Sequence, residues 1–157
     1  MQRSETCSWC RFDADRWTRN DLAQTLDCLG AWWRELVVGV EPLLLAQRPA
    51  PATWSAVEYA VHSGEILRLL DAFVEAILTV DDLDVAARPS IDAGAGDQPP
   101  TVAFAAAVDD LESAAQRLGR RYAAVPPAGW LRTARYDGDL VDAGDVLAHA
   151  VHDAGSS

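Results

Sequence analysis

The sequence contains no lysine, so all thirteen basic residues are arginines, and they stand mostly singly among twenty-four carboxylates. The formal net charge is −11. A protein that binds a nucleic-acid backbone needs a basic face, so this balance excludes nucleic acid as a partner. It also disfavours anionic membrane surfaces. Together with frequent Ala, Asp and Val, the absence of lysine indicates a bacterial genome rich in G and C.

Long apolar runs are missing as well. The longest, residues 36–46, contains Glu41 and is far shorter than the ~20 residues that a membrane-spanning helix needs. Residues 1–10 are polar, so no secretory signal is visible. We therefore expect a cytoplasmic protein that does not bind membranes. Its three cysteines are then more typical of reduced thiols than of a disulfide framework.

The chain also lacks a glycine-rich phosphate loop, a nucleophile elbow and a Cys-His nucleophile arrangement in its usual context. Half of its 157 residues are hydrophobic. A chain of this length buries roughly 68–70% of its unfolded surface. Residues 1–157 are therefore predicted to form a single domain with an ordinary core.

The first third of the chain predicts one interrupted helix. Residues 1–19 are polar and irregular, and either Thr18 or Asn20 can cap the helix that follows. Gly39 and Pro42 predict a kink or break after it. Its apolar residues recur every three or four positions: Leu22, Leu26, Leu29, Trp33 and Leu36.

A second helix is predicted to begin at Ser55, which forms a capping box with Glu58. Its expected apolar face includes a histidine, His62, which would then lie on the core side. The other members of this face are Tyr59, Ile66, Leu69, Leu70, Phe73 and Ile77.

The remaining chain predicts two more helices. Residues 81–100 are acidic, contain Gly and Pro, and show no periodicity, so they predict a long crossover loop. A third helix is expected over 101–125, a turn-rich connector over 130–140 with a tight turn at 136–139, and a short last helix over 142–153. The third helix has Phe104, Val108, Leu111, Ala115 and Leu118 as its apolar stripe. The predicted fold is all-α, a four-helix bundle with one long crossover.

The only histidines are His62, His149 and His152, all on predicted helices. His62 is either a buried neutral histidine satisfied by a carboxylate or a metal ligand with Glu58 or Glu65 as its hydrogen-bonding partner. His149 and His152, three residues apart, could face one ion, although this spacing is common by chance.

Cys7 and Cys10 form a C-x-x-C pair with three interpretations: a redox pair, half of a zinc knot, or ordinary thiols. A zinc knot needs four ligands, and Cys28 stands on a helix without a C-x-x-C partner. A thioredoxin-like motif needs a βαβ context, and the chain shows no convincing strand. Ordinary thiols are therefore favoured.

Several motifs resemble the DinB/YfiT-like superfamily, in particular its mycothiol-dependent branch of maleylpyruvate isomerase-like domains. Residues 7–13, CSWCRFD, resemble an opening C-x-x-C-x-F-D motif. Residues 48–62 resemble an R-P-x-P-x-x-W-S-x-x-E-Y-x-x-H segment, and residues 125–138 resemble the linker before the last helix. His152 and Asp153 resemble the start of an H-D-x-x-H-H motif.

The resemblance implies a four-helix bundle that holds a divalent metal, zinc or nickel, through three histidines. His62 matches the first ligand and His152 the second, while Ser156 stands at the position of the third. His149 is the best local substitute, ahead of Glu58, Glu65 and Asp153. Such a metal, with an open coordination position, activates mycothiol, another low-molecular-weight thiol, or a water.

Three functional hypotheses follow. The first is a protein derived from metal-dependent thiol S-transferases or isomerases, with an incomplete three-histidine site and weak or lost activity. The second is a working enzyme that uses His62, His152 and His149 and takes a small thiol or an electrophilic small molecule. The third is a non-catalytic helical bundle, a homodimer, that binds a ligand or partner.

Overall fold

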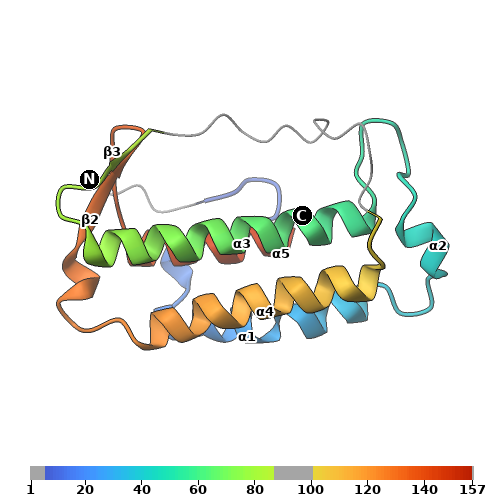
Figure 1. The fold of residues 1–157 in the computed structure, drawn as a ribbon, viewed down its shortest axis with the longest axis horizontal. Helices are drawn as coiled ribbons and strands as arrows, with labels where there is room; N and C mark the ends of the chain where they lie inside the picture. Colours follow the sequence, from blue (N-terminus) through green and yellow to red (C-terminus); the bar gives the residue numbers. More distant parts are fainter. Residues whose placement is uncertain (1–5, 87–100, 157) are drawn as a thin grey trace.

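The computed structural model describes residues 6–86 and 101–156, and it is a four-helix bundle with a small sheet at one end (Figure 1). The predicted all-α bundle is thereby confirmed. The long helices are α1 (Arg19–Leu36), α3 (Ala56–Thr79), α4 (Phe104–Ala123) and α5 (Ala143–Ser156). The short elements are η1 (Ala14–Arg16), α2 (Pro42–Leu45), β1 (Asp84–Val85), η2 (Gly129–Leu131), β2 (Thr133–Tyr136) and β3 (Asp139–Asp142).

The helix starts and the break follow from local side-chain chemistry. Thr18 is the residue that caps α1, in a reciprocal capping box with Asp21. The box predicted for Ser55 and Glu58 is present at the start of α3. The break after α1 is also confirmed, because Gly39 has a φ of +83° and α2 begins at Pro42.

Each long helix packs against two of the others. Helix α4 contacts α1 and α3, and α5 contacts the same two helices. In Figure 1, α3 and α4 lie side by side and run in the same direction. Two parallel neighbours require a connection that returns along the whole bundle, which explains the long crossover. Of that connection, residues 87–100 lie outside the described part of the chain.

The core stripe predicted for α4 is confirmed, since Phe104, Val108, Leu111, Ala115 and Leu118 are all buried. The face predicted for α3 needs correction. Leu69 is 45% exposed, and His62 and Ile66 are only half-buried, whereas Ala60, Ser63, Gly64, Leu67 and Val74 are buried. Small residues on this face allow close packing, since a Cβ on Gly64 would lie only 3.4 Å from Leu111 Cα.

The connector predicted over 130–140 is in fact a hairpin, so the expectation of no strand was wrong here. Strands β2 and β3 pair antiparallel, and β1, inside the predicted acidic loop, pairs parallel with β2. The tight turn predicted at 136–139 is confirmed: Asp137 and Gly138 have φ values of +50° and +86°. The sequence does not predict this hairpin, because its strands are only four residues long and mostly exposed and so lack a clear alternation of apolar and polar residues.

In its described part, residues 6–18, the N-terminal segment has only short elements before α1, in line with the irregular segment that was expected. An isolated bridge joins Thr6 to Asp13, and η1 follows at once. No helix in the described part of the chain is both long enough and apolar enough to cross a bilayer.

Candidate metal centre

The two N-terminal cysteines lie on a tight loop that closes on itself. The backbone N–H of Cys7 donates to the carbonyl of Phe12 at 2.9 Å, next to the bridge between Thr6 and Asp13. Arg11 adopts a left-handed conformation, with φ of +62°, which lets the chain reverse within a few residues. The loop therefore brings Cys7 and Cys10 to the same side.

Phe12 attaches this loop to the last helix. Its ring stacks on the imidazole of His152 with centroids 5.0 Å apart and an angle of 9° between the planes. Phe12 is also packed against the hydrophobic core. The N-terminal loop and the C-terminal half of α5 are thereby held together, although they come from opposite ends of the sequence.

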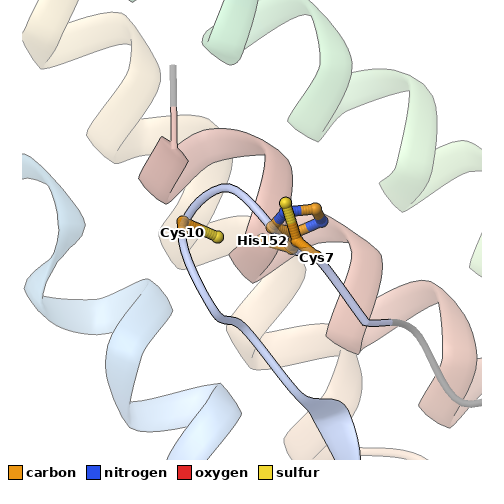
Figure 2. A group of neighbouring side chains, drawn as sticks. All are labelled: Cys7, Cys10 and His152. Carbon is orange, nitrogen blue, oxygen red and sulfur yellow. The ribbon is translucent and has the colours of Figure 1, made fainter.

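The result is a group of three possible metal ligands. One donor atom from each of Cys7, Cys10 and His152 lies within 4.8 Å of the other two. Figure 2 shows the loop arching over α5, with both thiols directed toward the imidazole. Cys7 and His152 are half-buried and Cys10 is exposed, so the group lies at the surface and is accessible to ions.

The surroundings of Cys7 favour its thiolate. Hydrogen bonds from the backbone of Cys10 and Trp9, and then one from the His152 side chain, lower the pKa of Cys7 from 9.0 to about 7. The thiolate is the form of cysteine that binds metals. The lowered pKa therefore favours the metal-binding form of Cys7 near neutral pH.

The donor set fits a divalent metal of the zinc type. Two thiolates and one imidazole are common ligands of Zn²⁺, at distances of about 2.3 and 2.0–2.1 Å. A tetrahedral ion would place its sulfur ligands about 3.8 Å apart by these bond lengths, so the donors, within 4.8 Å of one another, need only a small contraction. Three protein ligands leave a fourth position open, as in catalytic zinc sites.

The other two predicted histidine ligands are placed elsewhere. His62 packs edge-on against Trp54, with ring centroids 4.8 Å apart. His149 lines a cleft of about 1300 Å³ between α3, α5 and the hairpin. Among the described residues, which include all three histidines, the group of three close donors contains His152 but neither His62 nor His149. The three-histidine ligand set stays a prediction.

Glu58, one of the carboxylates considered as substitutes, has structural contacts of its own. Glu58 accepts from Arg48 and from the backbone of Ser55. Its pKa is lowered from 4.5 to about 2, chiefly by hydrogen bonds from Arg48. Because both its oxygens are engaged in this way, Glu58 acts as the anchor of the start of α3.

A second groove adjoins the cysteine loop. It has a volume of about 960 Å³ and is lined by Cys10, by Cys28 from α1, and by aromatic rings that include Phe12, Trp17 and Trp32. Cys28 is exposed and does not belong to the three-donor group. The three cysteines are free in the structure, as the sequence predicted.

Sequence reasoning identified all three donors but did not combine them. Residues 7–10 by themselves favour ordinary thiols, with half of a zinc knot as one alternative, and the sequence groups His152 with the other histidines. No local spacing connects residues 7 and 10 with residue 152. The local sequence does not single out Phe12 as the point of attachment, because Trp9 is also an aromatic residue of this polar segment and is 96% exposed.

The fold and this cluster define the chain as a four-helix bundle with a candidate metal centre. No family model matches the sequence, and no curated protein matches it either. Among solved structures, it is similar to YfiT from Bacillus subtilis, described as a probable metal-dependent hydrolase with an unusual four-helix bundle topology. The TM-score is 0.67 at 13% identity, over 98% of this chain and 85% of YfiT. At this identity the likeness establishes the shared fold.

Proposed function

We propose that this chain is a divalent-metal-binding bundle, derived from metal-dependent thiol (mycothiol) S-transferases or isomerases, whose metal is held by Cys7, Cys10 and His152. The clustering of these three donors within 4.8 Å carries the proposal. The likeness in fold to YfiT, a probable metal-dependent hydrolase, supports it. Zinc is favoured over nickel because two of the three donors are thiolates.

The proposed chemistry is limited by the ligand set. A bound zinc ion with an open position lowers the pKa of a thiol or water that binds there. With two thiolate ligands, however, the ion would carry less net positive charge than one held by three neutral imidazoles. Together with Ser156 at the position of the third histidine, this favours weak or lost S-transferase activity.

Metal analysis of the purified, reduced protein tests the ligand set. We expect about one zinc per chain in the wild type and in Cys28→Ser, the matched control for loss of a thiol. Cys7→Ser, Cys10→Ser and His152→Ala should each lose metal affinity by more than the 10–100-fold typical of outer-shell changes. Circular dichroism of each variant verifies that the helices persist.

The same measurement separates the two ligand sets. Loss of metal in His62→Ala, with full retention in Cys7→Ser and Cys10→Ser, would contradict the cysteine site and support the histidine set instead. An assay with a low-molecular-weight thiol and a generic electrophile tests the activity. We expect little turnover from the zinc-loaded protein, and fast turnover that disappears in His152→Ala would contradict the loss of activity.

A second candidate function is a non-catalytic homodimer. Its support is a run of exposed apolar side chains at the end of α1 and in α2, where Val38 is 80% and Leu43 79% exposed. Leu36 and Leu44, 59% and 57% exposed, lie in the same short stretch. A mass measurement in solution tests this candidate: a dimer that dissociates in Leu43→Glu would support it, and a monomer at all concentrations would count against it.

A further inference from the structure

The C-x-x-C pair has a geometry that suits a reversible covalent bond as well as metal binding. The sulfur atoms of Cys7 and Cys10 are no more than 4.8 Å apart, and a disulfide needs them at 2.03–2.05 Å. Only two residues separate the cysteines, on a loop already closed by the hydrogen bond from Cys7 to Phe12. A modest adjustment of this exposed loop therefore suffices to join the sulfurs, with no change in the bundle.

We propose that the Cys7–Cys10 pair is a redox switch of the metal site, in which oxidation to a disulfide releases the metal. This inference rests on the proposed metal-binding function. The disulfide removes two of the three donors and leaves His152 alone. A single imidazole on the protein surface does not retain a divalent ion against water, so metal release follows directly from bond formation.

Hydrogen peroxide serves as the oxidant in this reaction. Cys10 is the exposed thiol of the pair, so its thiolate attacks one peroxide oxygen: an S–O bond forms, the O–O bond breaks, and the leaving hydroxide takes a proton and departs as water. The Cys7 thiolate then attacks the Cys10 sulfur. The S–S bond forms, the S–O bond breaks, and a second hydroxide is protonated to water. Two electrons pass from the two sulfurs to the peroxide.

A dithiol reductant reverses the reaction. Its two thiols give two electrons and two protons to the disulfide and become a disulfide themselves. Cys7 and Cys10 return as thiols, and the loop, still held on α5 by Phe12, presents the original donor set. Because the bundle itself takes no part, the cycle should be complete without unfolding.

Cys28 serves as the control for loss of a thiol, and it is also the cysteine that could compete with Cys7 for a disulfide with Cys10. It lines the same groove as Cys10, so a Cys10–Cys28 disulfide is the competing product. Trypsin, which cleaves after Arg3 and Arg11, releases residues 4–11 with Cys7 and Cys10 together. A Cys7–Cys10 disulfide makes this peptide about 2 Da lighter, whereas a bond to Cys28 would link it to a peptide from α1.

The experiment treats the full-length, reduced, zinc-loaded protein with hydrogen peroxide. Zinc release is followed with a chromogenic chelator, free thiols are counted, and the tryptic peptides are weighed. We expect one zinc released for each two thiols lost, the lighter 4–11 peptide, and renewed zinc binding after a dithiol reductant. Cys28→Ser should behave identically.

Each contrary result has a distinct meaning. Zinc that stays bound after the two thiols are oxidised would overturn the switch, as would release accompanied only by sulfinic acid or by a bond to Cys28. If the reduced protein takes up no zinc at the start of the experiment, the proposed metal-binding function itself is wrong. Failure of the redox switch and failure of metal binding are therefore distinguishable.

Discussion

The rings of Phe12 and His152 lie nearly parallel, with centroids 5.0 Å apart and 9° between their planes. Phe12 follows Cys10 by two residues, so this contact sets where the cysteine loop rests on α5. It acts as the attachment point that brings thiols from the start of the chain to a histidine near its end. We therefore expect the candidate metal centre to depend on this aromatic contact.

Replacing Phe12 should weaken metal binding without removing a ligand. We expect Phe12→Ala to lower zinc affinity about 10–100-fold, as loss of an orienting partner does at other metal sites. Competition with a chromogenic chelator measures the change. Trp9→Ala is the matched control, since Trp9 lies in the same loop with 96% of its surface exposed. Equal affinity in wild type and Phe12→Ala would show that the stack does not position the loop.

Zinc should stabilise the folded protein through the cysteine site. At about 100 times the dissociation constant, a ligand of the native state adds about 2.7 kcal/mol. For a chain of this size, each kcal/mol raises the melting temperature by roughly 2–4 °C. Thermal melts with zinc or with a chelator measure this shift. It should be retained in Cys28→Ser and lost in Cys10→Ser, and a shift that is equal in both would refute the ligand assignment.

The ion pair between Arg48 and Glu58 should make stability depend on acid pH. Arg48 first of all, and Ser55 in addition, lower the pKa of Glu58 from 4.5 to about 2. Between pH values of about 2 and 4.5, Glu58 is protonated in the unfolded chain but ionised in the native protein. The stabilisation is therefore complete above about pH 4.5 and is lost as the pH falls through about 2.

Glu58→Gln tests this dependence. We expect it to lower the free energy of unfolding by about 2 kcal/mol at pH 7, since Glu58 is buried and hydrogen-bonded to a charged partner. The difference from wild type in urea denaturation should shrink as the pH falls toward 2. Glu65→Gln, an exposed change on the same helix, should have little effect at any pH. A difference independent of pH would argue against the lowered pKa.

Arg132 should be important for closing the end of α3. Its guanidinium donates to the carbonyls of Ile77 and Val80, both at 2.8 Å, and to the carboxylate of Asp81. Carbonyls at a helix end otherwise lack partners. We expect Arg132→Ala to destabilise the protein by about 1–2 kcal/mol in urea denaturation.

Arg132→Lys provides the matched comparison. A lysine keeps the charge but lacks the planar fork that reaches several acceptors at once, so it should restore only part of the lost stability. Full restoration by lysine would show that charge alone matters at this position.

Features set by neighbouring residues were predictable. Thr18 and Ser55 begin their helices because their side chains satisfy backbone donors three residues away. The buried stripe of α4 follows its sequence period. The exposed face of α3 was less readable. Ile66, Leu69 and Phe73 are apolar but line the cleft between α3, α5 and the hairpin, so apolar residues of α3 lie on more than the core side, and Leu69 was placed wrongly.

The sequence by itself determined the bundle, since helical periodicity and caps depend on residues a few positions apart. It also supplied every donor of the candidate metal centre. Only the tertiary structure decided which donors meet, because the loop with Cys7 and Cys10 reaches His152 through packing between the two ends of the chain. Local spacing carries no information about such a contact, which arises when Phe12 packs against α5.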